Sequence, residues 1–193
     1  MIKIEKNIIK KFINGVLRIY CKLLYKIEIN GLENVPKEGA VILCANHVSL
    51  IDAVIINCFT PRKTRYLAKE ELNKFYLRPF IKLYKIIMVK RDAKDLSAVK
   101  ESLKALKSND CLVIFPEGTR NGMEKGQKAK DGAAFFAVKT GAKVIPVGIS
   151  GGEKPFKKMY IKYGQPLDFS GRSKDELDQV TDEIMKKIIE LAK

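Results

Sequence analysis

The segment that most constrains the fold is 41–52, which reads VILCANHVSLID. Its first five residues form an apolar run that is long enough for a buried strand and too short for a helix. Asn46 and His47 interrupt this run, Ser49 is a candidate N-cap, and Asp52 stands five residues after the histidine. The segment therefore predicts a strand, a polar loop and a helix, in that order.

Short apolar runs of this kind recur along the chain and alternate with patterns of helical period. Strands are expected at 26–30, 41–45, 64–68, 85–91, 111–115, 144–149 and 159–163. Helices are expected at 1–25, 49–58, 96–106, 131–140 and from 173 onward. This alternation predicts an α/β fold, a single domain with a mixed central sheet flanked by helices and preceded by an N-terminal amphipathic helix.

His47 is the one histidine among 193 residues, and an unperturbed imidazole has a pKa of about 6.5. It is therefore the candidate general base. Positions five apart on a continuous helix differ by roughly 140°, so Asp52 can reach His47 only if the histidine precedes the helix. The alternative is a histidine that caps a strand end beside an ordinary acidic residue of a first helical turn. This segment taken alone favours that alternative.

The N-terminal segment 1–25 has the pattern of a basic amphipathic helix. Its apolar residues at helical spacing are Ile9, Phe12, Ile13, Val16, Tyr20, Leu23 and Leu24. Such a helix predicts an in-plane membrane anchor, and the same periodicity equally fits a helix that packs on its own domain. Apolar runs stay well below the ~18 residues of a membrane span.

The net charge and the cysteines limit which binding partners, metal sites and cellular environment the chain is expected to have. The net charge of +15 suits an anionic membrane surface, an acidic partner or nucleic acid. A nucleic-acid partner is not expected, because the chain has no recognised binding motif and its aromatic residues do not interleave with the basic ones. The four cysteines show no CxxC spacing, and the one histidine does not complete a zinc motif with them, so we expect no metal site and a reducing, cytosolic environment.

A second motif, FPEGTR at 115–120, follows a buried apolar run. Gly118 permits a tight turn, and the Arg120 guanidinium can bind a phosphate through two hydrogen bonds. Glu117 could accept hydrogen bonds from a polyol. Each of these features is common when it occurs alone.

Taken together, these motifs resemble the glycerolipid acyltransferase family, and within it the lysophosphatidate (1-acyl-sn-glycerol-3-phosphate) acyltransferases. The resemblance runs from about residue 27 to 166. It rests on NHVSLID at 46–52, KEEL at 69–72, a basic strand end at Arg91, FPEGTR at 115–120 and VIPVGI at 144–149. The family usually has a glycine before its second strand block, where this chain has Tyr84, Lys85 and Ile86.

The resemblance implies an O-acyltransferase. His47 would remove the proton from the sn-2 hydroxyl of 1-acyl-glycerol-3-phosphate, and Asp52 would orient the imidazole. The alkoxide would take the acyl group from acyl-CoA or acyl carrier protein and give phosphatidic acid, without an acyl-enzyme, metal or cofactor. The alternatives are the same chemistry on glycerol-3-phosphate or another lyso-lipid, or a non-catalytic basic module that binds membranes or nucleic acid.

The resemblance also assigns residues to the acceptor. The acceptor-binding block matches four successive residues: Glu117, Gly118, Thr119 and Arg120. Arg120 would bind the phosphate, and Arg91 and Lys69 match positions that the family associates more loosely with the same phosphate. We expect the donors for the oxyanion among backbone amides at the start of the helix over 49–58.

The predicted organisation is a membrane-associating helix over residues 1–25 and an acyltransferase domain over 26–193. A lysophospholipid substrate and a basic amphipathic helix together predict a peripheral protein on the cytoplasmic face of the cell membrane.

Overall fold

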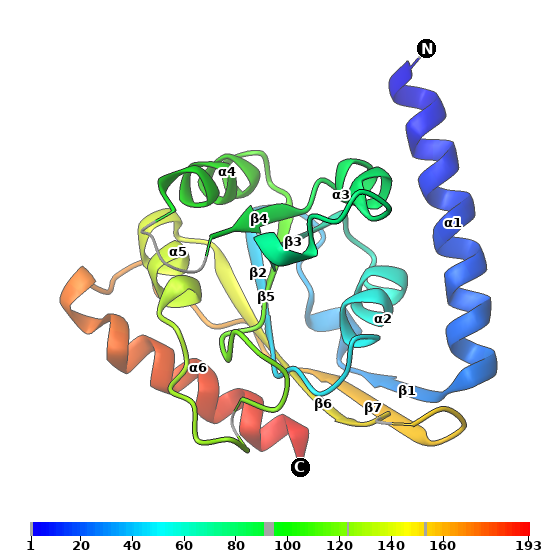
Figure 1. Ribbon diagram of the computed structural model, residues 1–193. Coiled ribbons are helices and arrows are strands. Elements are labelled where there is room, and N and C mark those ends of the chain that lie inside the picture. The colour runs from blue at the N-terminus through cyan, green and yellow to red at the C-terminus, as the bar shows by residue number, and fades with distance from the viewer. Residues whose placement is uncertain (1, 91–94, 123, 153) are drawn as a thin grey trace.

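The computed structural model describes residues 2–90, 95–122, 124–152 and 154–193 (Figure 1). The strands are β1 (Lys26–Asn30), β2 (Val41–Ala45), β3 (Thr64–Lys69), β4 (Ile87–Val89), β5 (Cys111–Ile114), β6 (Lys143–Gly151) and β7 (Lys158–Tyr163). The helices are α1 (Ile2–Leu24), α2 (Asp52–Phe59), α3 (Arg78–Tyr84), α4 (Leu96–Lys107), α5 (Gly132–Thr140) and α6 (Leu177–Ala192). Three short 3₁₀ turns complete the described elements: η1 (Leu32–Asn34), η2 (Glu70–Leu72) and η3 (Lys174–Glu176).

Within the described residues, the strands form one sheet in the order β1-β7-β6-β2-β5-β3-β4. β6 and β7 are antiparallel, and the other neighbours run parallel. The predicted α/β fold with a mixed central sheet flanked by helices is therefore confirmed. The strand expected at 85–91 is shorter in the structure, where β4 covers only Ile87–Val89, and Arg91 lies outside the described residues.

The sheet is buried on both faces, which explains why its central strands read as continuous apolar runs. All five residues of β2 are buried. Ile42 and Cys44 pack with the residues of α4, α5 and α6, whereas Val41, Leu43 and Ala45 pack with those of α1 and α2. The fold is thus three layers, with the sheet in the middle (Figure 1).

The parallel strands bring distant segments to one edge of the sheet. Cys44 of β2 lies opposite Ile114 of β5, so the two strands end together. β3 also runs parallel to β5 and ends at Lys69. Loops that follow parallel strands meet at the carboxyl edge, where open α/β sheets bind their ligands. The two sequence motifs and the KEEL segment therefore start from the same edge.

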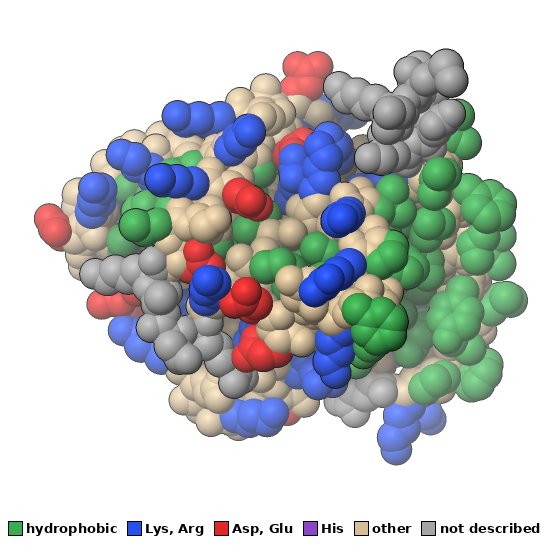
Figure 2. All heavy atoms as spheres, turned by 45° about the horizontal axis from the view of Figure 1, so that its top comes forward, with side chains coloured by type: hydrophobic (Ala, Val, Ile, Leu, Met, Phe, Trp, Pro, Cys, Tyr) green, Lys and Arg blue, Asp and Glu red, His purple; other side chains and the backbone are tan. Residues whose placement is uncertain are grey.

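The α1 helix packs on the domain through its more polar side. Cys21 is fully buried, and the Asn14 side chain bonds to Asn57 and Tyr84 at 2.9 and 2.6 Å. The opposite side consists of exposed apolar residues that span about 120° of the helix circumference at 100° per residue. They are Ile8, Ile9, Phe12, Val16, Ile19, Tyr20 and Leu23, and they form the column of hydrophobic side chains at the right of Figure 2.

The turn between α3 and β4 contains one residue in the left-handed conformation. Lys85 follows α3 with φ of 51°, the conformation that a glycine adopts most readily after a helix. Its backbone N–H bonds to the carbonyl of Ile81, which ends the helix. A lysine thus makes the turn before β4 in a conformation that glycine usually supplies.

Candidate active site

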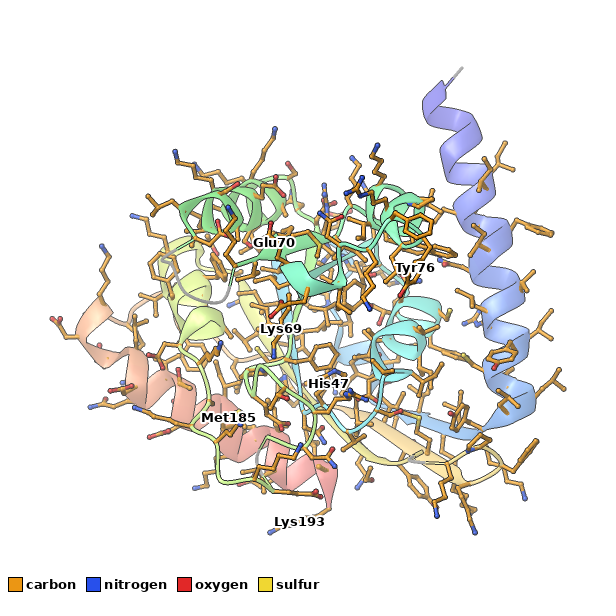
Figure 3. The ribbon with its side chains drawn as sticks, viewed as in Figure 1. His47, Lys69, Glu70, Tyr76, Met185 and Lys193 are labelled. Atoms are coloured by element: carbon orange, nitrogen blue, oxygen red, sulfur yellow. The ribbon has the colours of Figure 1, made fainter. Side chains whose placement is uncertain are left out.

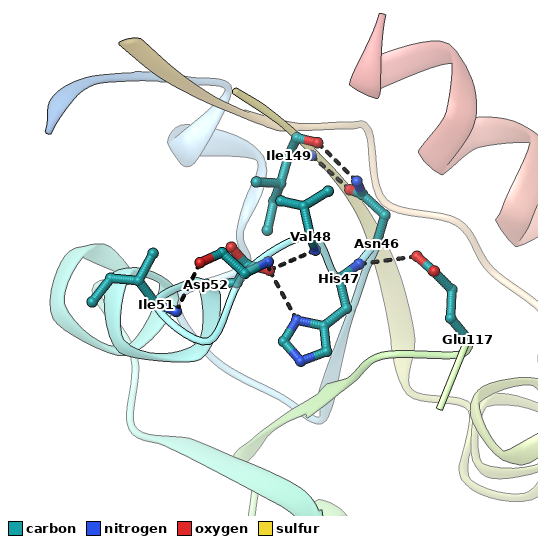
Figure 4. Close-up of polar contacts among 8 residues, drawn as sticks. Asn46, His47, Val48, Ile51, Asp52, Glu117 and Ile149 are labelled. Carbon is teal, nitrogen blue, oxygen red and sulfur yellow. Dashed lines mark hydrogen bonds and ion pairs between the residues drawn. The ribbon is translucent and has the colours of Figure 1, made fainter. Parts of the chain in front are cut away.

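The site is built around the loop that joins β2 to α2. Nδ1 of His47 lies 2.9 Å from Oδ2 of Asp52, and the same oxygen accepts the backbone N–H groups of Val48 and Ser49, each at 2.8 Å (Figure 4). The Asp52 side chain is fully buried. The predicted contact is present because His47 precedes the helix and Asp52 is the first residue of α2.

This contact determines which imidazole nitrogen is basic. An ionised carboxylate only accepts hydrogen bonds. In the neutral His47 ring the proton is therefore on Nδ1, and this N–H donates a hydrogen bond to Asp52. Nε2 then has a lone pair, and it has no hydrogen-bond partner among the described residues. The His47 side chain is 18% exposed, so a hydroxyl group can approach it from solvent. The arrangement suits a general base whose imidazolium form is stabilised by a buried carboxylate.

The segment after β5 fixes His47 from the other side. The N–H of His47 donates to Oε1 of Glu117 at 2.9 Å, and its carbonyl accepts the N–H of Asn121 at 2.7 Å. The ring of Phe115 stacks on the imidazole with centroids 4.3 Å apart and an interplanar angle of 25°. The two sequence motifs thus form one structural unit.

Glu117 lies deeper than an exposed acceptor ligand would. Glu117 is only 3% exposed. Gly122 packs so closely against it that a Cβ added to Gly122 would lie 2.8 Å from the Cβ of Glu117. In this structure its carboxylate therefore positions the backbone of His47, while contact with an acceptor hydroxyl stays a prediction. Gly118 has φ of 64° and closes a turn by donating its N–H to the carbonyl of Phe115 at 3.0 Å, as expected from the motif.

Three basic residues that the structure describes lie near the carboxyl edge of the sheet, where His47 is located. Arg120 is exposed, Thr119 is partly exposed, and Lys69 stands at the end of β3 on the same side of the sheet as His47 (Figure 3). Lys130 was not predicted as a site residue, although its side chain packs over Gly118. In the sequence it lies in a loop, 121–130, that is rich in glycine and lysine, and it begins the short KDG segment at 130–132. The predicted phosphate contact of Arg91 falls outside the described residues.

Asn46 is a positioning residue that the sequence interpretation missed. Its side-chain amide donates to the carbonyl of Ile149 and accepts the Ile149 N–H, both at 2.7 Å, and the residue is 3% exposed. These bonds join the start of the loop that carries His47 to β6. The available signal was a polar residue directly after a buried strand, where an amide must find partners.

The prediction that Ser49 caps the helix was wrong. α2 begins at Asp52, with Ile51 in the N-cap position and no side-chain cap. Oγ of Ser49 instead accepts the N–H of Ile51 at 3.5 Å, ahead of the helix. Asp52 binds the amides of Val48 and Ser49, which are therefore engaged within the loop rather than directed at an oxyanion.

The cysteines are poorly suited to nucleophilic chemistry. Burial raises the pKa of the Cys21 thiol to about 11 and that of Cys111 to about 12. Burial also raises the pKa of Cys44 and Cys58. Since the thiolate is the reactive form, none of the four is activated for attack at neutral pH.

Substitution of Asn46 tests its role in the loop. Asn46→Ala leaves the N–H and carbonyl of Ile149 buried without their partners, so we expect the free energy of unfolding to fall by about 2–4 kcal/mol. Urea denaturation measures the change. Asn73→Ala, at an exposed position, is the matched control and should change stability by less than about 0.5 kcal/mol. Equal stability of the two variants would contradict the role assigned to Asn46.

Comparison with known proteins agrees with this geometry. Residues 26–150 match the family model described as Acyltransferase. The 1-acyl-sn-glycerol-3-phosphate acyltransferase of Bacillus subtilis is 30% identical over 94% of this chain and 96% of its own, and that of Borreliella burgdorferi is 29% identical over 84% and 72%. The crystal structure of the 1-acyl-sn-glycerophosphate acyltransferase of Thermotoga maritima superposes with a TM-score of 0.76 at 29% identity, covering 99% of this chain and 83% of that one. The chain belongs to the acyltransferase family.

Proposed function

We propose that this protein transfers a fatty acyl group from an acyl thioester to the sn-2 hydroxyl of 1-acyl-glycerol-3-phosphate and so makes phosphatidic acid. The observation that carries the proposal is the contact of His47 Nδ1 with the buried Asp52, which leaves Nε2 available at the carboxyl edge of the sheet. The names of the relatives support the choice of acceptor, because the matched proteins from both bacteria carry this activity in their names.

The reaction needs only one proton carrier. Nε2 of His47 takes the proton of the acceptor hydroxyl as its oxygen attacks the thioester carbonyl, and Asp52 stabilises the imidazolium that forms. When the tetrahedral intermediate collapses, the carbon–sulfur bond breaks and the proton passes from His47 to the leaving thiolate. The products are the ester and a free thiol, and His47 returns to its neutral form.

The proposed acceptor contacts follow from charge. A phosphate monoester needs fixed cations, and a guanidinium binds it through two parallel hydrogen bonds. Arg120 is exposed next to the segment that fixes His47, and Lys69 ends the neighbouring strand. We assign the phosphate to these two residues, with Arg91 as a further predicted ligand. Lys130, packed over Gly118, adds positive charge to the same region.

The donor is proposed to be acyl-CoA or acyl carrier protein, used as a co-substrate, with no other cofactor. A thioester already carries an activated acyl group, so a base and an oriented hydroxyl are sufficient to transfer it. The exposed basic surface suits both donors, since CoA carries phosphates and acyl carrier protein is acidic.

We further propose that the protein is peripheral and binds an anionic membrane on the cytoplasmic face through α1, with no nucleic-acid partner. The exposed side of α1 is apolar, which suits lipid hydrocarbon rather than a nucleic acid. None of the described helices combines the length and apolar character needed to cross a bilayer. The four free cysteines are consistent with a reducing compartment.

The catalytic assignment predicts loss of acyl transfer in two variants. His47→Ala removes the base, and Asp52→Asn removes the carboxylate that fixes its tautomer, so each should lower kcat by about 10³-fold or more. Thiol release and phosphatidic acid formation are followed together, with lysophosphatidate and each type of thioester. Circular dichroism shows whether the variants are folded. A folded His47→Ala variant with wild-type kcat would overturn the assignment.

The phosphate assignment predicts a selective change in KM. Arg120→Ala should raise the KM for lysophosphatidate by about tenfold or more, because a charged hydrogen-bond donor is lost, and should leave the KM for the thioester unchanged. Arg172→Ala removes an exposed arginine near the start of α6 and is the matched control. Equal KM values for lysophosphatidate in the two variants would exclude Arg120 as the phosphate ligand.

The membrane assignment predicts loss of vesicle binding when negative charges are introduced into the exposed apolar face of α1. Phe12→Asp combined with Val16→Asp places two carboxylates in the exposed apolar face, so co-sedimentation with vesicles that contain phosphatidylglycerol should fall about tenfold or more. The control combines Leu96→Asp with Ile189→Asp, which are exposed apolar positions on α4 and α6. Unchanged sedimentation of the α1 variant would show that this face does not contact lipid.

A further inference from the structure

A second exposed apolar surface lies between the active site and α1. It belongs to residues 72–80, which form the end of η2, the following turn and the start of α3. Four large side chains in this short stretch point into solvent: Leu72 at 46% exposure, Phe75 at 80%, Tyr76 at 56% and Phe80 at 47%. Neither the fold nor the proposed reaction explains why a segment of this composition is left uncovered.

Basic side chains alternate with the apolar ones in this segment. Lys74 and Arg78 are exposed within it, and Lys82 is exposed one turn later on α3. In Figure 2 hydrophobic side chains next to Lys and Arg lie beside the apolar column of α1. A protein interface is depleted of lysine at its core, whereas aromatic side chains mixed with cations are typical of elements that lie in the interface of an anionic membrane.

The segment is rigidly attached to α1. Tyr84, at the end of α3, is buried, and its hydroxyl donates to Oδ1 of Asn14 at 2.6 Å. The ammonium of Lys10 lies 4.6 Å from the centre of the Tyr84 ring. The ring of Phe80 is stacked with that of Tyr84, with the ring centroids 6.5 Å apart. Because α1 and α3 are packed together, a bilayer that contacts the exposed face of α1 is close to the 72–80 segment as well (Figure 1).

The other end of the segment leads directly to the active site. η2 follows Lys69, the last residue of β3, at the carboxyl edge of the sheet. Figure 3 shows Lys69 and Glu70 above His47, with Tyr76 between this edge and α1. An element that enters the membrane here would place the acceptor site at the level of the lipid headgroups.

We propose that the 72–80 segment is a second membrane-binding element, which inserts Phe75 and its apolar neighbours into the interfacial layer of an anionic phospholipid bilayer. Its cations then contact lipid phosphates, and the carboxyl edge of the sheet faces the membrane. The binding itself follows from exposed side chains alone. Its consequence, access of a lysophospholipid to His47 directly from the bilayer, rests on the proposed function.

A single tryptophan tests the insertion, because the chain contains none. Phe75→Trp places the only indole of the protein in the segment, and Ile189→Trp places it at an exposed position on α6 as the matched control. Emission is recorded with vesicles of phosphatidylcholine alone and with one quarter phosphatidylglycerol, both with and without brominated acyl chains. We expect a blue shift and bromine quenching for Phe75→Trp with the anionic vesicles, and neither for Ile189→Trp.

The alternative outcomes separate this proposal from the proposed function. Emission of Phe75→Trp that stays unshifted on vesicles that sediment with the protein would overturn the insertion, whatever the enzyme activity. A shift that requires a soluble protein partner, and not lipid, would also overturn it. A shift on vesicles without any transfer to lysophosphatidate would support the membrane element and contradict the proposed reaction.

A second variant tests the consequence for catalysis. Phe75→Ser removes one inserted side chain, so the ratio of activity on vesicle-borne lysophosphatidate to activity in detergent micelles should fall about tenfold. Ile189→Ser should leave that ratio unchanged. An equal ratio for the two serine variants would contradict delivery of the substrate through this segment.

Discussion

The hydrogen bonds of Asp52 are the interaction on which the active site depends. One oxygen of a fully buried carboxylate binds the imidazole of His47 and the amides of Val48 and Ser49. The same contacts turn the chain from β2 into α2, so the loop conformation and the tautomer of the base have one cause. Removal of the carboxylate would affect both at once, which is why an acid at this spacing is required.

The loop is held in place by strands that are remote in sequence. Glu117 and Asn121, which follow β5, bind the backbone of His47, and Asn46 binds Ile149 of β6. β5 and β6 are the two parallel neighbours of β2, so the order of strands in the sheet brings these partners together. The imidazole that we propose as the base is thereby positioned by rigid elements on both sides, as an efficient catalytic group requires. The same edge carries the cations that suit a phosphate.

Local patterns predicted the buried strands, because these depend on residues close in sequence. They allowed the meeting of His47 with Asp52 but taken alone favoured the alternative, and it was the family resemblance that implied this contact. Local patterns could not predict the bond from His47 to Glu117, which joins residues 70 apart and depends on strand order. The start of α2 could not be predicted from Ser49 either, because the helix begins three residues later, at Asp52, without a side-chain cap. The period of α1 located its apolar stripe, but not the fact that this stripe faces away from the domain. The inner side is the one that carries Asn14, whose half-buried side chain bonds to Asn57 and Tyr84.

The most direct test of the central claim is the tautomer of His47. Labelling the protein with ¹⁵N-histidine gives one imidazole in the spectrum, since the chain has one histidine. At a pH where the ring is neutral, we expect a protonated Nδ1 and an unprotonated Nε2, with the balance moving toward protonated Nε2 in Asp52→Asn. A wild-type spectrum that already shows the proton on Nε2 would contradict the role assigned to Asp52 and, with it, the assignment of His47 as the base.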